Sequence, residues 1–166
     1  MKLLVSLLSS LLLSMSVNAA DVGAPAPSFT VDAIKNVAAE KINLDEYKGK
    51  VVYVDFWASW CGPCKRSFPK LEELRAKYKD KGFEVIAINM DENVQDAKDF
   101  LEKFPVTFPI GSDPKGGIAE QYKIKGLPSA YIIDRQGAIS HIVVGFDEKT
   151  EFETIESVTT KLLGIQ

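Results

Sequence analysis

Residues 51–65 read VVYVDFWASWCGPCK, and this stretch decides the fold. Its first part, residues 51–57, is β-branched or aromatic apart from Asp55, so it is apolar on both faces. A run of this kind predicts a central strand that is covered on both sides. A short loop follows, and Cys61 and Cys64 stand where a helix is expected to begin. Strand, loop and helix in this order are typical of an α/β fold.

The rest of the chain alternates in the same way. The helix after the loop is expected over residues 63–79, because Phe68, Leu71, Leu74 and Tyr78 share one face. Strands are expected at 28–32 and 41–44 as a hairpin, then at 83–90, 108–111, 130–134 and 138–144, and further helices at 94–104, 117–122 and 148–163. The short strand 108–111 is placed at an edge of the sheet. We therefore predict one α/β domain, a mixed central sheet with helices on both faces.

The composition excludes several classes of protein. The chain has 166 residues and a formal net charge of −3, and 46% of its residues are hydrophobic, as in a globular domain. The acidic balance argues against nucleic acid as the main partner. Two cysteines and one histidine cannot complete a four-ligand zinc site, so we expect no metal. The cysteines can form at most one disulfide.

The N-terminus has the three parts of a secretory signal peptide. A short positive start is followed by an apolar stretch broken by serines, and residues 17–20 read VNAA, which allows cleavage after Ala19 or Ala20. An uncleaved membrane anchor is the alternative, although a span needs about 20 apolar residues. We predict a signal peptide over residues 1–20, a mature domain over residues 21–166, and export to the periplasm.

The motif Trp60-Cys61-Gly62-Pro63-Cys64-Lys65 carries the chemistry. Two residues between the cysteines let the sulfurs close a small disulfide ring at the start of the helix. Unpaired N–H groups and the positive end of the helix dipole favour a thiolate there, so the pKa of the Cys61 thiol is expected to be lowered. Cys61 is then the exposed nucleophile and Cys64 the resolving thiol. A structural disulfide and half of a metal site are the alternatives, and both fit the spacing and ligand count poorly.

Residues 54–65 resemble the active-site stretch of thioredoxins. Pro69 matches the proline inside that family's active-site helix, and Gly126-Leu127-Pro128-Ser129 resembles its loop with a cis-proline against the cysteines. Residues 134–137 and Gly145 fit its terminal hairpin.

The resemblance covers about residues 24–164, and three further features indicate one branch of the thioredoxin-like proteins. The signal peptide, the N-terminal hairpin and the extra helix at 94–104 are similar to those of exported TlpA/ResA-like thiol–disulfide oxidoreductases, which are often grouped with redoxins or AhpC/TSA proteins. The resemblance implies a thioredoxin-like three-layer sandwich with an N-terminal β-hairpin and an inserted helix.

Asp55 is the candidate proton carrier. It is the lone acid in an apolar strand, and burial raises the pKa of a carboxyl group. The resemblance assigns it the proton of Cys64 when that thiol attacks a mixed disulfide. A structural acid bonded to the backbone is the alternative. Two departures from the family concern its surroundings: Ala87 stands where many thioredoxins have lysine, and Ser67 stands where cytochrome-maturation members carry a carboxylate.

The expected substrate contacts surround the cysteines: Trp60, Gly62, Pro63, Leu127 and Pro128. A cis bond before Pro128 would turn the Leu127 backbone toward the cysteines, where an extended substrate could pair with it like an added strand. The alternative for Pro128 is an ordinary turn proline. Trp57 is expected in the core, and His141 is expected to be structural.

Together these features predict a periplasmic protein-disulfide reductase. Cys61 and Cys64 form the redox-active disulfide, no cofactor is expected, and the resemblance implies a membrane electron donor of the CcdA or DsbD type. The protein is expected to be a monomer, acting in cytochrome c maturation or in general periplasmic reduction. The alternatives are a thiol peroxidase of the redoxin type, a redox-gated binding or chaperone module and, within the same class, an oxidase or isomerase.

Overall fold

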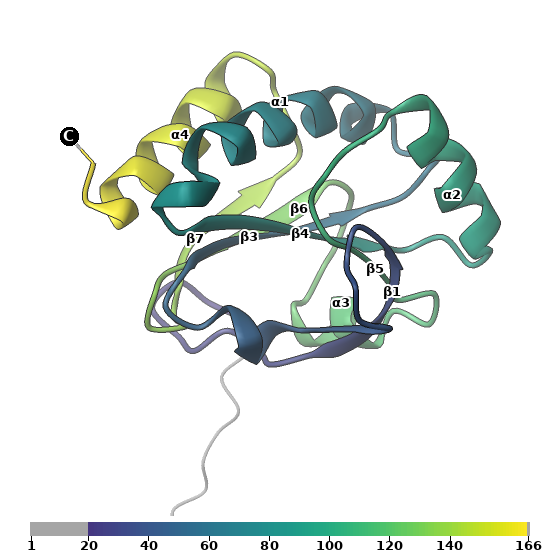
Figure 1. The fold of residues 1–166 in the computed structure, drawn as a ribbon, viewed down its shortest axis with the longest axis horizontal. Helices are drawn as coiled ribbons and strands as arrows, with labels where there is room; N and C mark the ends of the chain where they lie inside the picture. Colours follow the sequence, from purple (N-terminus) through teal and green to yellow (C-terminus); the bar gives the residue numbers. More distant parts are fainter. Residues whose placement is uncertain (1–19, 166) are drawn as a thin grey trace, which may run out of the picture.

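A computed structural model describes residues 20–165, so the predicted signal peptide lies outside the described residues except for Ala20. A seven-stranded sheet forms the centre, in the order β2-β1-β5-β4-β3-β6-β7 (Figure 1). The strands are β1 (Thr30–Lys35), β2 (Lys41–Asn43), β3 (Val51–Trp57), β4 (Phe83–Asn89), β5 (Ile110–Ser112), β6 (Ser129–Ile133) and β7 (Ile139–Val144). The helices are α1 (Gly62–Tyr78), α2 (Val94–Lys103), α3 (Gly117–Gln121) and α4 (Thr150–Leu163), with short 3-10 turns at Leu44–Tyr47 and Lys79–Lys81.

The sheet is mixed, as predicted. Strand β4 runs parallel to both of its neighbours, β3 and β5. The remaining pairs are antiparallel, among them the N-terminal hairpin of β1 and β2 and the C-terminal hairpin of β6 and β7. This is the thioredoxin-like arrangement that the sequence resemblance implies.

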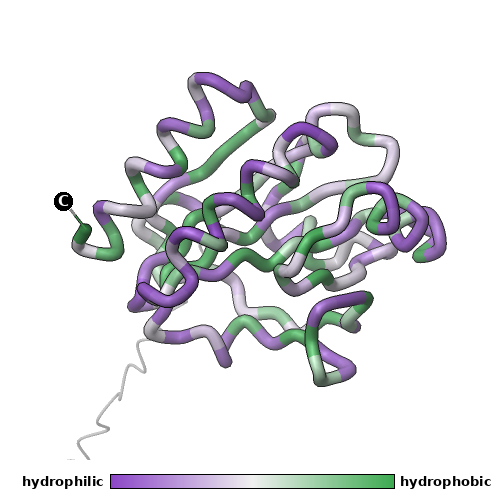
Figure 2. The backbone as a smooth tube through the Cα atoms, turned by 45° about the horizontal axis from the view of Figure 1, so that its top comes forward, coloured by the Kyte–Doolittle hydropathy of each residue, from purple (hydrophilic) through white to green (hydrophobic). Residues whose placement is uncertain are grey.

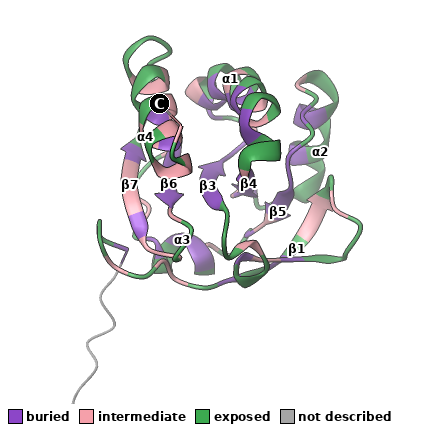
Figure 3. Ribbon diagram, turned by 60° about the vertical axis from the view of Figure 1, so that its left-hand side comes forward, coloured by how far each residue is buried: buried purple, intermediate pink, exposed green. Residues whose placement is uncertain are grey.

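Helices cover both faces of the sheet. Helices α1, α2 and α4 lie on one side, with α1 between the other two, and α3 lies on the opposite side (Figures 1 and 3). The alternation of β3 divides its side chains between two cores. Tyr53 and Trp57 pack with the α1 side, whereas Val54 and Phe56 pack with α3 and the N-terminal hairpin. Every residue of β3 is buried, which explains its continuous apolar run.

The helix that follows the cysteines is amphipathic. Phe68, Leu71, Leu74 and Tyr78 of α1 are buried, as their spacing predicts. The backbone tube in Figure 2 shows the contrast with the sheet: hydrophobic colour fills the central strands, while hydrophilic and hydrophobic residues alternate along the helices. Among residues 20–165, no helix combines the length and apolarity needed to cross a bilayer.

The expected edge position of the 108–111 strand is wrong. Strand β5 lies inside the sheet, between β4 and β1. The N-terminal hairpin adds to β5 and places β2 at the edge instead. Gly111 permits this approach, because a Cβ atom at that position would lie 2.4 Å from Cγ1 of Val31.

Candidate active site

The two cysteines lie where β3 ends and α1 begins. Their sulfurs form a disulfide with an S–S distance of 2.02 Å and a Cα–Cα distance of 5.3 Å. Cys61 is the N-cap residue of α1, and its Sγ accepts a hydrogen bond from the Cys64 N–H at 3.3 Å. The sulfur of Cys61 therefore stands at the unpaired N–H groups of the helix, as the sequence predicts.

Cys61 is less exposed than expected. In the disulfide form 4% of its surface is accessible, and none of Cys64 is. The reason is that Cys61 caps the helix and is bonded to a sulfur in the apolar core between the sheet and α1. The exposed group of the motif is Trp60, at 71%. Trp60 therefore presents a large apolar side chain to solvent next to the shielded disulfide.

Asp55 lies in the same core layer as the cysteines. It alternates along β3 with Tyr53 and Trp57, which face α1, and its neighbours on the adjacent strands are Ala87 and Ala130. Its exposed fraction is 1%, and neither carboxyl oxygen has a hydrogen-bond partner within residues 20–165.

The surroundings of Asp55 favour its neutral form. Loss of hydration raises the pKa of this carboxyl group well above its ordinary value, and no cation in the described part of the chain opposes the effect. Ala87, where many thioredoxins carry lysine, stands directly opposite Asp55 on β4. The alternative of a structural acid bonded to the backbone finds no such bond in the structure. Asp55 is a buried carboxyl group suited to carrying a proton.

The Leu127–Pro128 peptide bond is cis, as expected. Ser129 follows it and pairs with Phe56, so the loop lies at the end of β3 from which Cys61 follows. The Pro128 carbonyl accepts from Gly145 N–H at 2.8 Å. The half-buried Leu127 packs against the core that contains the cysteines. Fold and register thus bring the loop and the disulfide to one end of the sheet.

Asp91 is a site residue that the sequence analysis did not identify. Its buried carboxylate accepts from the Ser59 N–H at 2.9 Å, from the Ser59 hydroxyl at 3.0 Å and from the Asn89 side-chain amide at 2.7 Å. Ser59 lies in the turn closed by the Cys61 N–H and the Ala58 carbonyl, at 3.1 Å. Asp91 therefore fixes, from the end of β4, the turn that presents Trp60 and Cys61.

The structure also places three other residues considered in the sequence: Ser67, Trp57 and His141. Ser67 is buried, and its hydroxyl donates to the Cys64 carbonyl at 3.1 Å. Trp57 is fully buried between Phe68 and Phe100, with ring centroids 4.8 and 4.9 Å away, which confirms its place in the core. His141 is half-buried on β7, opposite Ile132.

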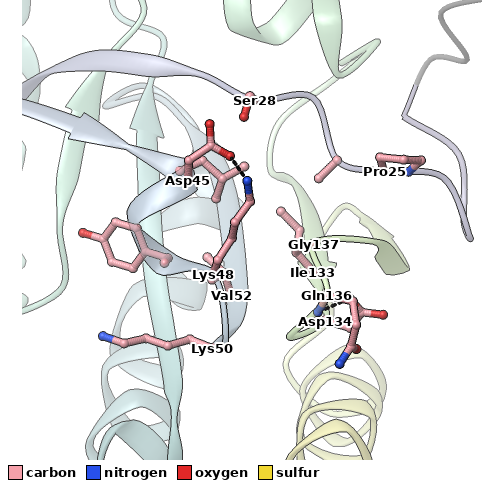
Figure 4. Close-up of a pocket in the computed structure, with 13 residues that line it drawn as sticks. Pro25, Ser28, Asp45, Lys48, Lys50, Val52, Ile133, Asp134, Gln136 and Gly137 are labelled. Atoms are coloured by element: carbon pink, nitrogen blue, oxygen red, sulfur yellow. Dashed lines mark hydrogen bonds and ion pairs between the residues drawn. The ribbon is translucent and has the colours of Figure 1, made fainter.

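A hollow of about 280 Å³ lies at the other end of the sheet (Figure 4). Lys50 and Val52 line it at the start of β3, together with the Lys48–Asp45 ion pair of 2.9 Å. Residues 53–57 of β3 lie between Val52 and the turn that leads to Cys61, a distance of about 17 Å along the strand. It therefore has no part in the disulfide chemistry.

Comparisons with known proteins show the family to which the chain is similar. The model of the AhpC/TSA family matches residues 22–142. The thiol–disulfide oxidoreductase ResA of Bacillus thuringiensis is 35% identical over 133 residues, which are 80% of this chain and 75% of that protein. ResA of Geobacillus kaustophilus is 35% identical over 82% of this chain and 78% of its own.

Solved structures give the same result. A crystal structure assigned as the thiol:disulfide interchange protein DsbE from Chlorobium tepidum is 41% identical, with a TM-score of 0.82 over 87% of this chain and 99% of that chain. A solution structure assigned as a protein disulfide isomerase from Bacteroides thetaiotaomicron is 30% identical, with a TM-score of 0.77 over 87% of this chain and 91% of that chain.

Proposed function

The chain belongs to the AhpC/TSA family and is a thiol–disulfide oxidoreductase, and we propose that it reduces disulfides of exported proteins through Cys61 and Cys64. The observation that carries this proposal is the disulfide at the N-cap of α1, in the same core layer as a buried acid that has no hydrogen-bond partner among residues 20–165. The active form is the dithiol, in which the N-terminus of α1 favours the Cys61 thiolate.

The first step is attack on the substrate. The Cys61 thiolate bonds to one sulfur of the substrate disulfide, and the other substrate sulfur leaves as a thiolate that takes a proton from water. Trp60, Gly62 and Pro63 form the rim that the substrate contacts, and the backbone of Leu127 before Pro128 pairs with its extended chain. Trp60 supports this assignment because it is a large apolar side chain left in solvent.

The second step releases the substrate. The ionised form of Asp55 takes the proton of Cys64, which attacks the Cys61 sulfur, so that the Cys61–Cys64 disulfide forms and the second substrate sulfur leaves as a thiolate. Asp55 then passes the proton, through water, to that thiolate. Two electrons pass from the protein to the substrate, and an external dithiol protein must supply them again.

The cellular setting follows from the N-terminal sequence and the resemblance to exported oxidoreductases. The signal peptide of residues 1–20 directs the domain of residues 21–166 to the periplasm, where the protein acts as a monomer. A membrane dithiol protein of the CcdA or DsbD type restores the thiols. Substrates are oxidised periplasmic proteins in general or apocytochromes c.

The test is to equilibrate the purified protein with glutathione redox buffers and to follow insulin-disulfide reduction. We expect a potential close to that of thioredoxin, about −270 mV, and catalysed reduction. A potential near that of strong oxidants, about −120 mV, would overturn the assigned direction. Turnover of hydrogen peroxide without insulin reduction would instead indicate a peroxidase. Cys64→Ser is expected to trap substrates as mixed disulfides, and identification of the adducts names them.

A further inference from the structure

A groove starts beside the cysteines and runs between α1 and α2. Its first part is a hollow of about 240 Å³ lined by Ser59, Lys65 and residues of α2, among them Lys103. Its second part, about 360 Å³, lies between Pro69 and the segment Phe104-Pro105. Lys103 and Phe104 line both hollows, so the two adjoin each other. We call them together the α1–α2 groove.

The two parts of the groove differ in chemistry. In the part near the cysteines, Lys65 of α1 faces a wall of α2 that carries Asp96, Asp99 and Lys103. No ion pair within residues 20–165 engages either lysine. The lysines can donate to the carbonyl groups of a peptide backbone, and the aspartates can accept from its N–H groups. The distant part has mostly apolar walls. Phe104 is half-buried there, and Pro69 and Pro105 are exposed.

The far wall of the groove is fixed in place. The Thr107 N–H donates to Glu72 of α1 at 2.8 Å, and the Thr107 hydroxyl is 2.6 Å from the same carboxylate. Arg75 donates to the Thr107 hydroxyl at 2.7 Å. Phe104 is packed against Phe100, with ring centroids 4.7 Å apart. A preformed groove loses little conformational entropy when it is filled.

We propose that the α1–α2 groove binds the substrate segment next to the reacting cysteine and selects a large apolar side chain in its distant part. The inference rests on the proposed reduction of protein disulfides. The distant part begins at Phe68, seven residues along α1 from its N-cap Cys61, which is about 10 Å at the helical rise. An extended chain covers that length in about three residues. The selected side chain therefore lies about three residues from the cysteine.

The test uses synthetic peptides whose single cysteine is in a mixed disulfide with glutathione. One pair differs only in having Phe or Ser three residues before the cysteine, and a second pair differs three residues after it. Oxidised glutathione is the small substrate that does not reach the groove. We expect the reduced protein to favour the Phe peptide of one pair by about tenfold in kcat/KM, the effect of burying one aromatic side chain.

Two proline variants separate the groove from the rest of the surface. Pro105→Glu places a charge at the apolar part and is expected to abolish the preference. Pro114→Glu is the matched control, since Pro114 is also an exposed loop proline but lies outside the groove. All three proteins should reduce oxidised glutathione equally and unfold at the same temperature.

Two outcomes overturn the groove alone: equal rates on the Phe and Ser peptides of both pairs, or a preference that survives Pro105→Glu. Failure of the wild-type protein to reduce any of the disulfides, glutathione included, overturns the proposed function as well.

Discussion

Two buried acids on neighbouring strands have opposite surroundings. Glu84 of β4 accepts two hydrogen bonds from Arg75 of α1, one of them 3.2 Å long, and a third from the Val85 N–H at 2.9 Å. Asp55 of β3 has neither a cation nor a hydrogen-bond donor within the described part of the chain. Glu84 lies at the start of its strand, far from the cysteines, and Asp55 lies near the end of β3 that leads to them.

Because their surroundings differ, we expect Glu84 to stabilise the fold and Asp55 to act in the reaction. A carboxylate that accepts from a guanidinium and from a backbone N–H joins two elements of the fold. A buried carboxyl group without partners costs free energy when it ionises, so its pKa is raised and it can hold a proton where an exposed carboxyl group would not. Changes near Glu84 should therefore affect stability, and changes near Asp55 should affect the reaction.

The largest effect is expected for the cysteines. Cys64→Ser should reduce turnover on insulin to the uncatalysed rate and leave a stable mixed disulfide on Cys61, because no second thiol can resolve it. Mass spectrometry of the adduct checks this. Arg75→Met is the control that should keep its turnover, and a fully active Cys64→Ser protein would contradict the two-thiol mechanism.

Asp55→Asn should slow the resolving step by about 100-fold, because the Cys64 proton loses its acceptor. Rapid mixing of the reduced variant with a peptide disulfide measures the decay of the mixed disulfide. The step should depend on pH in the wild-type protein and much less in the variant. Equal rates in both proteins would assign Asp55 to structure, like Glu84.

The free energy of unfolding should also depend on the protonation of Asp55. Burial raises its pKa above the unfolded value of about 3.9, so the folded state binds more protons between the two values. The free energy of unfolding should then fall as pH rises from about 4 through the folded-state pKa. Denaturant titrations at several pH values should show a decline in the wild-type protein that is weaker in Asp55→Asn.

Arg75→Met should lower the free energy of unfolding by about 2 kcal/mol, because it leaves the largely buried Glu84 without its main partner. Urea unfolding measures the loss. The rate of insulin reduction at a temperature where the variant is folded should not change. A large loss of rate would show that the two ends of α1 are coupled.

The smallest effect is expected for Ser59→Ala, which removes one of the bonds to Asp91 and should cost about 1 kcal/mol. The Ser59 N–H still donates to the carboxylate, so the turn before Cys61 should keep its shape. The redox potential, measured against glutathione, should match that of the wild-type protein.

Local sequence patterns predicted much of this molecule. The apolar run of β3 and the single apolar face of α1 each define an element whose burial is periodic along the chain, and the burial of Asp55 follows from its strand. The position of β5 could not be predicted in this way, because three residues do not reveal which strands lie on either side. Asp91 is 32 residues from Ser59 in sequence, so their contact required the fold. The shielding of Cys61 depends on its capping geometry.

The interior position of β5 makes two parts of the chain depend on each other. In the described structure the N-terminal hairpin joins the rest of the sheet through the pairing of β1 with β5, and β5 enters the fold together with α2. The hairpin and the inserted segment therefore pack together as one unit, although they come from two separate parts of the sequence. Deleting residues 92–112 would remove β5, the strand with which the N-terminal hairpin pairs, although the hairpin lies about 50 residues or more earlier in the sequence. A chimera of this protein would have to transplant both parts together.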